Sequence, residues 1–324
     1  MSRKTAVLAS LLIAVVTAGA VAAMSVSAAT SVTAKTLHFA LVTGDNHDPF
    51  YVTMNEGAQA EAKKLGVKVS WQGPATFEAA PQITILDTLL ASKPNFLIVA
   101  PTDVNALVNP IKQFNKAKIP VLTVDTDVNN HSVRLGNITS NNLLGGQIAA
   151  SYLAKAGAKT VAYVGEQRGV FTTDQRWKGF QGAIKKAKGV NYVGAQFGAD
   201  DPNTATSIVD ALLTRYPKLD GIFASDTAYG QGAATAVQNA GKAGKVKIVA
   251  FDAEPDEVTA LSRGLIQALI VQKAYDMGVD AVKYADDYIT KGTKPPANTN
   301  PSYVIATKAN IHKPGIAKYI YHQK

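Results

Sequence analysis

The sequence contains no cysteine and is poor in glutamate: its 324 residues include 18 Asp but only 6 Glu. Without cysteine the chain cannot form disulfides, thiolate metal sites or iron–sulfur clusters, and it has no cysteine nucleophile. Glutamate suits helix faces, whereas aspartate suits turns and helix N-termini. The surplus of aspartate therefore indicates many turns between strands and helices, and these turns are where functional side chains are first expected. The length is sufficient for two domains.

Several enzyme signatures are absent as well. The sequence has no Gly-x-Ser-x-Gly elbow, no Walker A loop and no Rossmann glycine fingerprint. Its five histidines show no metal-ligand pairing at helical spacing. Residues 125–136 begin like an EF-hand calcium loop, but Asn130 and Gly136 stand where that loop needs Gly and Glu. We therefore predict no catalytic residue, no metal and no cofactor. A glycosidase remains an alternative, because two carboxylates could serve one and nothing singles out an acid and a base.

The formal net charge is +9, and it raises the question of a nucleic-acid partner. The lysines are scattered over expected helices and their ends, and no arginine-rich stripe with interleaved aromatic residues occurs. This pattern is typical of solvated helix surfaces rather than of a nucleic-acid interface. We predict no nucleic-acid partner.

The N-terminus has the three parts of a secretory signal. Arg3 and Lys4 are followed by an almost wholly apolar stretch, 6–23, and then by small residues up to Ala29. We predict that residues 1–29 are a signal peptide cleaved after Ala28 or Ala29, so that the mature chain is periplasmic or secreted. No cysteine is available for a lipid anchor. An uncleaved membrane anchor is the alternative, because the apolar stretch approaches the length that spans a bilayer.

Beyond the signal, short apolar strands alternate with amphipathic helices. The expected strands are 37–43, 67–71, 96–100, 119–124, 160–164, 192–197, 221–224, 246–251, 266–271 and 303–307. The expected helices are 50–65, 80–91, a helix after 103, 142–155, 175–187, 204–215, 229–240, 255–263 and 275–289. Apolar strands in this alternation predict parallel sheets covered on both faces. The pattern breaks near 132–139 and then restarts, which predicts two doubly wound α/β lobes. Residues 291–301 are expected to form a loop.

Many aspartates lie where the expected strands end, and ligands of such sheets bind at the carboxyl ends of strands. For Asp103 and Asp201 a helix N-cap is the favoured interpretation. Asp125, Asp226 and Asp252 follow apolar strands so closely that ligand binding is favoured. Carboxylates accept strong hydrogen bonds from hydroxyl groups. Aromatic residues that could cover a sugar ring, or simply pack in the core, are Phe50, Tyr51 and Trp71.

The order and spacing of several short motifs carry a resemblance to a known family. These motifs are Asp48-Pro49-Phe50-Tyr51, Pro120-Val121-Leu122-Thr123-Val124-Asp125, Asn142-Leu143-Leu144-Gly145-Gly146, Arg176-Trp177-Lys178-Gly179-Phe180 and Phe251-Asp252-Ala253, with Gln272 further on. With them the mature chain resembles the ribose-binding type of periplasmic sugar-binding proteins of ABC importers. Trp71-Gln72-Gly73-Pro74, Thr173-Asp174-Gln175 and Gln196-Phe197-Gly198 look closer to the rhamnose-binding and autoinducer-2-binding branch.

The resemblance implies two lobes joined by three crossover strands, the periplasmic binding protein fold of type I. The crossovers are expected near Thr139, Gln272 and Ser302. The N-terminal lobe is then 35–138 plus 273–301, and the C-terminal lobe is 139–272 plus 302–324. The two lobes would close on a sugar between them.

The resemblance also implies the binding residues. The expected ligand contacts are Asp48, Phe50, Tyr51, Trp71, Asp125, Thr126, Asp174, Gln175, Arg176, Asp200, Asp226, Asp252 and Gln272. Three of these depart from the ribose binders: Thr126 replaces an Arg, Asp200 a stacking aromatic residue and Asp226 an Asn. The departures speak against ribose itself, and an acyclic polyol fits as well as a pyranose.

The expected function follows from the resemblance and the signal. The chain would be an exported monomer that captures a sugar or polyol and delivers it to the membrane permease of an ABC importer. A sugar sensor for a chemoreceptor is compatible with this function. The effector lobes of LacI-type repressors share the architecture, but a signal peptide stands where their DNA-binding headpiece would be.

Overall fold

The computed structural model describes residues 36–322, and the predicted signal peptide lies outside them. Its first sheet has six strands in the order β11-β5-β4-β3-β1-β2, and every recorded pairing is parallel. The bounds are β1 His38–Val42, β2 Lys68–Gln72, β3 Phe96–Val99, β4 Val121–Val124, β5 Asn137–Ile138 and β11 Asn298–Thr299.

The second sheet repeats this order as β12-β10-β9-β8-β6-β7. Its bounds are β6 Thr160–Glu166, β7 Asn191–Gly198, β8 Gly221–Ala224, β9 Lys247–Phe251, β10 Ala268–Val271 and β12 Val304–Ala306. Only β12 runs antiparallel, against β10. In both sheets the chain starts on an inner strand, adds one neighbour and then continues on the other side. The strand order therefore reverses next to β1 and next to β6, which is where ligands of such sheets bind.

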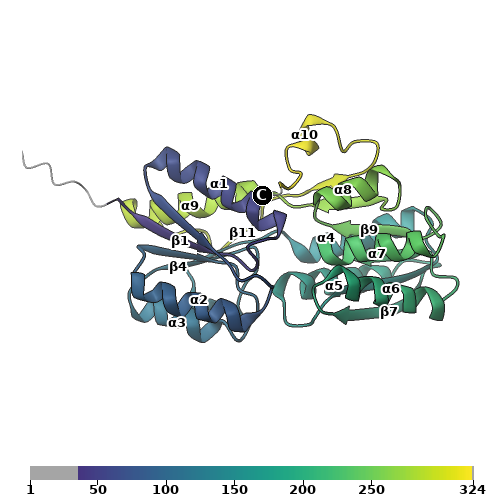
Figure 1. Ribbon diagram of the computed structural model, residues 1–324, viewed down its shortest axis with the longest axis horizontal. Helices are drawn as coiled ribbons and strands as arrows, with labels where there is room; N and C mark the ends of the chain where they lie inside the picture. The colour runs from purple at the N-terminus through teal and green to yellow at the C-terminus, as the bar shows by residue number, and fades with distance from the viewer. Residues whose placement is uncertain (1–35, 323–324) are drawn as a thin grey trace, which may run out of the picture. The chain divides into compact units, whose positions relative to one another are not determined.

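Helices cover both faces of each sheet (Figure 1). The helices around the first sheet are α1 Pro49–Leu65, α2 Ala79–Ser92, α3 Val108–Lys116 and α9 Ala274–Lys291. The others are α4 Asn142–Lys155, α5 Phe171–Ile184, α6 Pro202–Arg215, α7 Thr227–Asn239, α8 Pro255–Ser262 and α10 Pro314–Ala317, with a 3₁₀ helix at His131–Val133. Among the described residues, no helix combines the length and the apolar character needed to cross a membrane.

Alternation along the strands builds the two faces of each sheet. In β1, Phe39 and Leu41 pack in the cluster that contains Met54 of α1, whereas Ala40 and Val42 pack with Ile111 of α3. Successive side chains of a strand point to opposite faces, so a strand covered on both faces must be apolar throughout. This is why the apolar runs of the sequence located the strands.

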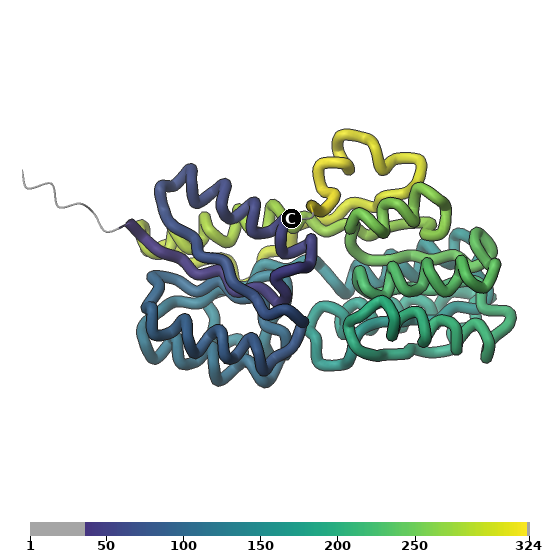
Figure 2. Tube along the Cα trace, in the orientation of Figure 1, coloured from purple at the N-terminus to yellow at the C-terminus, as the bar shows by residue number. Residues whose placement is uncertain are grey.

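The chain passes between the two sheets three times: after β5, after β10 and after β11. The predicted fold class, two doubly wound α/β lobes with three crossovers, is confirmed. The C-terminal segment, yellow in Figure 2, returns toward α1, where the backbone N–H of His322 donates to Oγ1 of Thr53 at 2.8 Å. The same segment also contacts the second half, where the backbone N–H of Tyr321 donates to the carbonyl of Ala253 at 3.1 Å.

Two local predictions were wrong. Residues 291–301 are not all loop, because Asn298 and Thr299 form β11 against β5. Two-residue strands carry no periodic pattern, and their pairing depends on a segment far away in the sequence. Helix α5 begins at Phe171 rather than near 175. The sequence does not mark this start, because no side chain caps the first turn of the helix.

Candidate functional site

One polar pocket lies at the carboxyl ends of the strands of both sheets. Nine of the residues predicted from the sequence line it: Asp48, Phe50, Tyr51, Asp125, Arg176, Asp200, Asp226, Asp252 and Gln272. Residues from both lobes therefore face one cavity, as the topological rule for parallel sheets requires.

Asp125 and Asp252 occupy matching places in the two sheets. Each directly follows a strand at the same place in the strand order, β4 for Asp125 and β9 for Asp252. Each also has a left-handed backbone, with φ of 62° at Asp125 and 81° at Asp252. Aspartate tolerates this region better than most residues, but such a conformation still costs energy and tends to occur at functional sites. The strained turns hold both carboxylates at the mouth of their sheets.

Hydrogen bonds fix both carboxylates in position. The Tyr51 hydroxyl donates to Oδ2 of Asp125 at 2.7 Å. Oδ1 of Asp252 accepts from Nε2 of Gln272 and from the hydroxyl of Tyr321, both at 2.7 Å. These side chains are all buried, so the carboxylates cannot turn away from the cavity.

Arg176 is the only positively charged residue among those that line the pocket. Its Nε donates to Oδ1 of Asn142 at 2.8 Å and its Nη1 to the carbonyl of Ser225 at 2.7 Å. The guanidinium lies over the ring of Phe251 at 3.7 Å, and Nη1 is 3.9 Å from Oδ2 of Asp252. Arg176 is thus held by neutral groups and is only loosely paired with a carboxylate.

Two of the pocket aspartates also cap helices. Oδ1 of Asp48 accepts from the backbone N–H of Phe50 at 2.7 Å at the start of α1, and Oδ1 of Asp226 accepts from Tyr229 at 3.0 Å at the start of α7. The N-cap interpretation and the binding interpretation therefore do not exclude each other. Asp201 caps α6, as predicted, whereas Asp103 accepts from Asn105 and Ala106 in a turn before α3.

Burial and mutual repulsion make the carboxyl groups hard to ionise. Burial raises the pKa of Asp125 to about 6, although Tyr51 and Arg176 act in the opposite direction. Burial and the nearby charge of Asp226 raise the pKa of Asp200 to about 8. Burial also raises the pKa of Glu166 well above its ordinary value, helped by the charge of Asp200. The pKa of Asp48 is raised well above its usual range by burial and by Glu254.

Aromatic side chains form an apolar part of the pocket wall. Phe50 and Tyr51 make an edge-on contact with ring centroids 5.1 Å apart, and Phe77 lines the same cavity. Gly44 allows this arrangement, because a Cβ there would lie 2.2 Å from Cε2 of Phe77 and 2.8 Å from the Tyr51 hydroxyl. A glycine after β1 thus makes room for two of the rings at the site.

Four residues predicted as contacts lie outside the residues that line this pocket. Nε1 of Trp71 donates to Oγ1 of Thr43 at 2.9 Å beside β2. Oγ1 of Thr126 donates to the carbonyl of Pro101 at 2.6 Å. Asp174 forms an ion pair with Arg168, and Gln175 lines a separate hollow with Asn141 and Asn300. We do not assign these four to the pocket.

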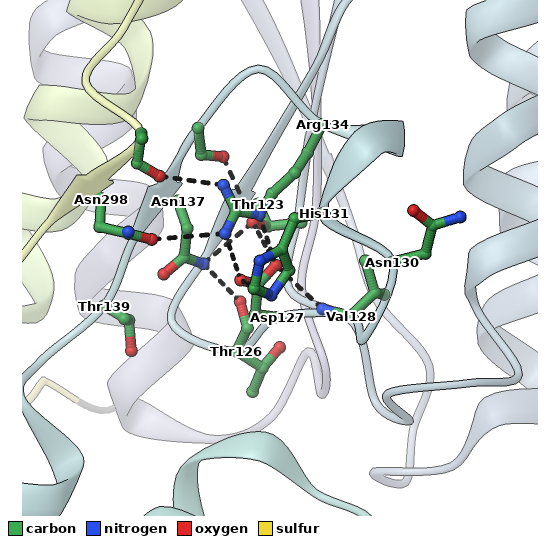
Figure 3. Close-up of polar contacts among 12 residues, drawn as sticks. Thr123, Thr126, Asp127, Val128, Asn130, His131, Arg134, Asn137, Thr139 and Asn298 are labelled. Carbon is green, nitrogen blue, oxygen red and sulfur yellow. Dashed lines mark hydrogen bonds and ion pairs between the residues drawn. The ribbon is translucent and has the colours of Figure 1, made fainter.

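Thr126 lies instead beside a buried ion pair (Figure 3). Nε of Arg134 donates to Oδ1 of Asp127 at 2.8 Å, and Nη2 donates to Oδ2 at 2.7 Å. Arg134 also reaches the other crossover, donating to the carbonyl of Ala297 at 2.9 Å and to Oδ1 of Asn298 at 3.3 Å. Arg134, held by Asp127, therefore ties the segment between β4 and β5 to β11, and Asp127 is not among the residues lining the pocket.

The sequence reasoning missed five lining residues: Phe77, Glu166, Thr172, Thr227 and Ala228. Glu166 could have been found, because it ends β6 in the same way that the selected aspartates follow their strands. Tyr321, which donates to Asp252, lies in a C-terminal segment without any motif.

Comparisons with known proteins agree with this geometry. Residues 39–294 match the family described as periplasmic binding protein domain. The ribose import binding protein RbsB of Salmonella typhimurium is 34% identical over 85% of this chain and 92% of its own length. The D-allose-binding periplasmic protein of Escherichia coli is 28% identical over 82% of this chain and 88% of its own length.

Solved structures show the same architecture. An ABC transporter solute-binding protein from Agrobacterium vitis, bound with α-D-tagatopyranose, is similar with a TM-score of 0.86 and 35% identity, covering 89% of this chain and 100% of that one. A carbohydrate transporter solute-binding protein from Agrobacterium radiobacter, in complex with D-arabinose, has a TM-score of 0.84 and 29% identity, covering 89% and 99%.

The fold and the pocket define a bilobal binding protein of type I. The chain belongs to the periplasmic binding protein family, and the resemblance seen in its motifs is confirmed.

Proposed function

We propose that this chain is an exported solute-binding protein that captures a sugar or polyol between its two lobes and delivers it to the permease of an ABC importer. One observation carries the proposal: a pocket at the strand ends is lined by charged hydrogen-bonding side chains from both lobes and by aromatic rings from the N-terminal lobe. Carboxylates accept hydrogen bonds from hydroxyl groups, and aromatic rings cover the apolar C–H faces of a sugar. The sugars named for the two solved relatives support the same ligand class.

The lobes proposed from the sequence are 35–138 plus 273–301 and 139–272 plus 302–324. Asp125 would then bind from the N-terminal lobe, and Asp226 and Asp252 from the C-terminal lobe. A ligand that contacts both lobes only in the closed form shifts the equilibrium toward closure. The three crossings between the sheets provide the hinge, and the closed form is the one that the permease recognises.

The proposal includes a binding role without catalysis. The pocket holds several carboxyl groups, and no pair of them is set apart as acid and base. An exported glycosidase is the enzyme alternative, and turnover of aryl-glycosides by the purified protein would establish it. We further propose that the mature chain acts as a monomer in the periplasm after removal of residues 1–29. A sensory role with a chemoreceptor uses the same binding event.

A thermal-shift screen tests the function. The purified mature protein is heated with pentoses, hexoses, deoxy sugars and polyols, each at millimolar concentration. A ligand that binds only the folded state raises the melting temperature. At a ligand concentration one hundred times Kd, it adds about 2.7 kcal/mol to the free energy of unfolding. At least one compound of this class is expected to stabilise the wild type, and the same compound should stabilise Asp252→Asn less. If no sugar or polyol changes the melting temperature, the proposed function is wrong.

A further inference from the structure

The charge of the pocket is far from balanced. Among the described residues that line it, six carry carboxyl groups: Asp48, Asp125, Glu166, Asp200, Asp226 and Asp252. Arg176 is the one cationic residue among these lining residues, and its Nε and Nη1 donate to an amide oxygen and a backbone carbonyl. Neutral sugars need donors and acceptors in similar numbers, because each hydroxyl does both. In their ionised forms the six carboxylates of this pocket offer only acceptors.

A buried acceptor points in the same direction. Gln272 lines the pocket and is only 2% exposed, and its Nε2 is used by Asp252. Its Oε1 has no hydrogen-bond partner among the described residues. A buried acceptor without a donor costs free energy that a ligand donor would recover. A ligand group that is rich in hydrogen-bond donors would therefore suit this pocket.

The acidic character extends to the neighbouring hollow. Asp48 and Asp200 also line a second depression, together with Asp45 and Glu254. The side chains whose charges act on Asp200 are Asp226, Asp45, Glu254 and Asp201, and all of them are acidic. Asp200 receives no hydrogen bond from the described part of the chain. A positive charge beside Asp200 would relieve this repulsion.

A metal ion does not fit this arrangement. Within residues 36–322, no three His, Asp or Glu side chains are placed to share a metal ion. Calcium, for example, needs six to eight oxygen ligands within about 2.6 Å. A protonated amine needs only a few acceptors, has three donors and accepts no hydrogen bond. The aromatic side chains Phe50, Tyr51 and Phe77 then suit the carbon skeleton that carries the amine.

We infer that the ligand is a hydroxyl-rich compound with a protonated amine, an amino sugar or amino polyol, whose ammonium group binds beside Asp200. This inference rests on the proposed function and narrows its ligand class. The raised pKa of Asp125 supports it, because this buried group is costly to ionise until a cation arrives. A sugar phosphate would meet the same carboxylates with a repulsive charge.

Titration calorimetry at pH 6.5 tests the inference with matched probes. The pairs are D-glucosamine with D-glucose, D-galactosamine with D-galactose, and N-methyl-D-glucamine with D-sorbitol. N-acetyl-D-glucosamine and putrescine separate the charge from the hydroxyl groups. In at least one pair we expect the amine to bind about tenfold or more tightly than its neutral partner, because a charge-assisted hydrogen bond replaces a neutral one. Putrescine and the N-acetyl sugar are expected to bind more weakly than that amine.

Asp200→Asn provides the decisive variant. It should lower the affinity for the amine about tenfold more than it lowers the affinity for the matched neutral sugar. The matched control is Asp201→Asn, which removes the same charge one residue away and keeps an N-cap for α6, since Asn caps as well as Asp. The control should change neither affinity by more than about twofold.

The outcomes separate the two proposals. Neutral sugars that bind as tightly as their amines, or an Asp200→Asn variant that weakens both equally, would overturn the inference and leave the proposed function intact. If putrescine binds and no sugar, amino sugar or polyol does, both proposals are wrong. No binding by any probe of either class contradicts both as well.

Discussion

Asp125 and Asp127 are two residues apart, yet the structure treats their carboxylates in opposite ways. Asp127 is 2% exposed and is neutralised by Arg134, with further hydrogen bonds from Oγ1 of Thr123 at 3.0 Å and from the backbone N–H of Val128 at 2.9 Å. Asp125 faces the pocket and receives one side-chain hydrogen bond, from Tyr51. Figure 3 shows how closely the partners of Asp127 surround it.

The difference distinguishes a structural carboxylate from one that is available to a ligand. A buried charge is stable when a partner and hydrogen bonds compensate it, and costly when they are missing. The protein supplies that compensation fully around Asp127 and only in part around the pocket, where Arg176 is the one cation among the lining residues. The residues of the pocket are therefore complete only with a ligand, whereas the Asp127 cluster is complete without one.

Removing the positive charge of Arg134, which compensates Asp127, should have the largest effect of the changes considered, and the effect should be on stability. Arg134→Met leaves a buried carboxylate without its partner, so we expect a loss of about 3–5 kcal/mol in the free energy of unfolding. Urea unfolding followed by circular dichroism measures it. The double variant Asp127→Asn with Arg134→Met should recover part of this loss, because no buried charge remains unpaired. A loss below about 1 kcal/mol for the single variant would show that Asp127 does not depend on Arg134.

Neutralising Asp252 should affect ligand binding next most strongly. Asp252→Asn keeps a residue that tolerates φ of 81° and can still accept from Gln272 and Tyr321, but it loses the charge. We expect binding of the ligand found by the thermal-shift screen to weaken by about 1.5–3 kcal/mol in titration calorimetry. Asp256→Asn on the exposed side of α8 is the control and should bind as the wild type does. Equal affinities for the two variants would remove Asp252 from the site.

The unliganded protein should become less stable as the pH rises, and Asp125 should account for part of this change. Its pKa in the folded chain is about 6, above the ordinary 3.8, so the folded state holds the proton more tightly than the unfolded state. The stabilisation is present at low pH and is lost as the pH rises through 6. The groups that face Asp125 are Tyr51, Arg176 and Asp252.

Asp125→Asn removes this titration. We compare the free energy of unfolding of the variant with that of the wild type at pH 4 and at pH 8. Between these pH values the difference should shift by about 1–2 kcal/mol in favour of the variant. Thermal unfolding of the two proteins at both pH values measures the change. Asp210→Asn, at an exposed position of α6, should show the same difference from the wild type at pH 4 and pH 8. A pH-independent difference for Asp125→Asn would contradict the assignment.

Asp174 should show the smallest effect on binding. It pairs with the half-exposed Arg168 and does not line the pocket. We expect Asp174→Asn to change ligand affinity by less than about 0.5 kcal/mol, as is usual for a partly exposed ion pair. A loss above about 1 kcal/mol in calorimetry would show that the liganded protein brings Asp174 into the site, as the sequence resemblance suggested.

Most of the fold could be predicted because its strands are covered on both faces and read as continuous apolar runs. The exceptions, β5 and β11, have two residues each and pair with segments distant in sequence. The site was predictable where a carboxylate directly follows such a strand, as at Asp125 and Asp252. Phe77 and Tyr321 escaped prediction, because they reach the site from segments without strand or helix periodicity.

The scarcity of Glu and abundance of Asp could be read from the sequence alone, and so could the strand ends where those aspartates gather. Only the tertiary structure decided which of them are neutralised. Arg134 reaches Asp127 because the chain turns back between β4 and β5, whereas Arg176, which faces Asp125, forms no ion pair with it in the described part of the chain. Hydrophobic periodicity is local and is written along the chain, whereas the compensation of a buried charge depends on which distant groups the fold brings within a few ångströms.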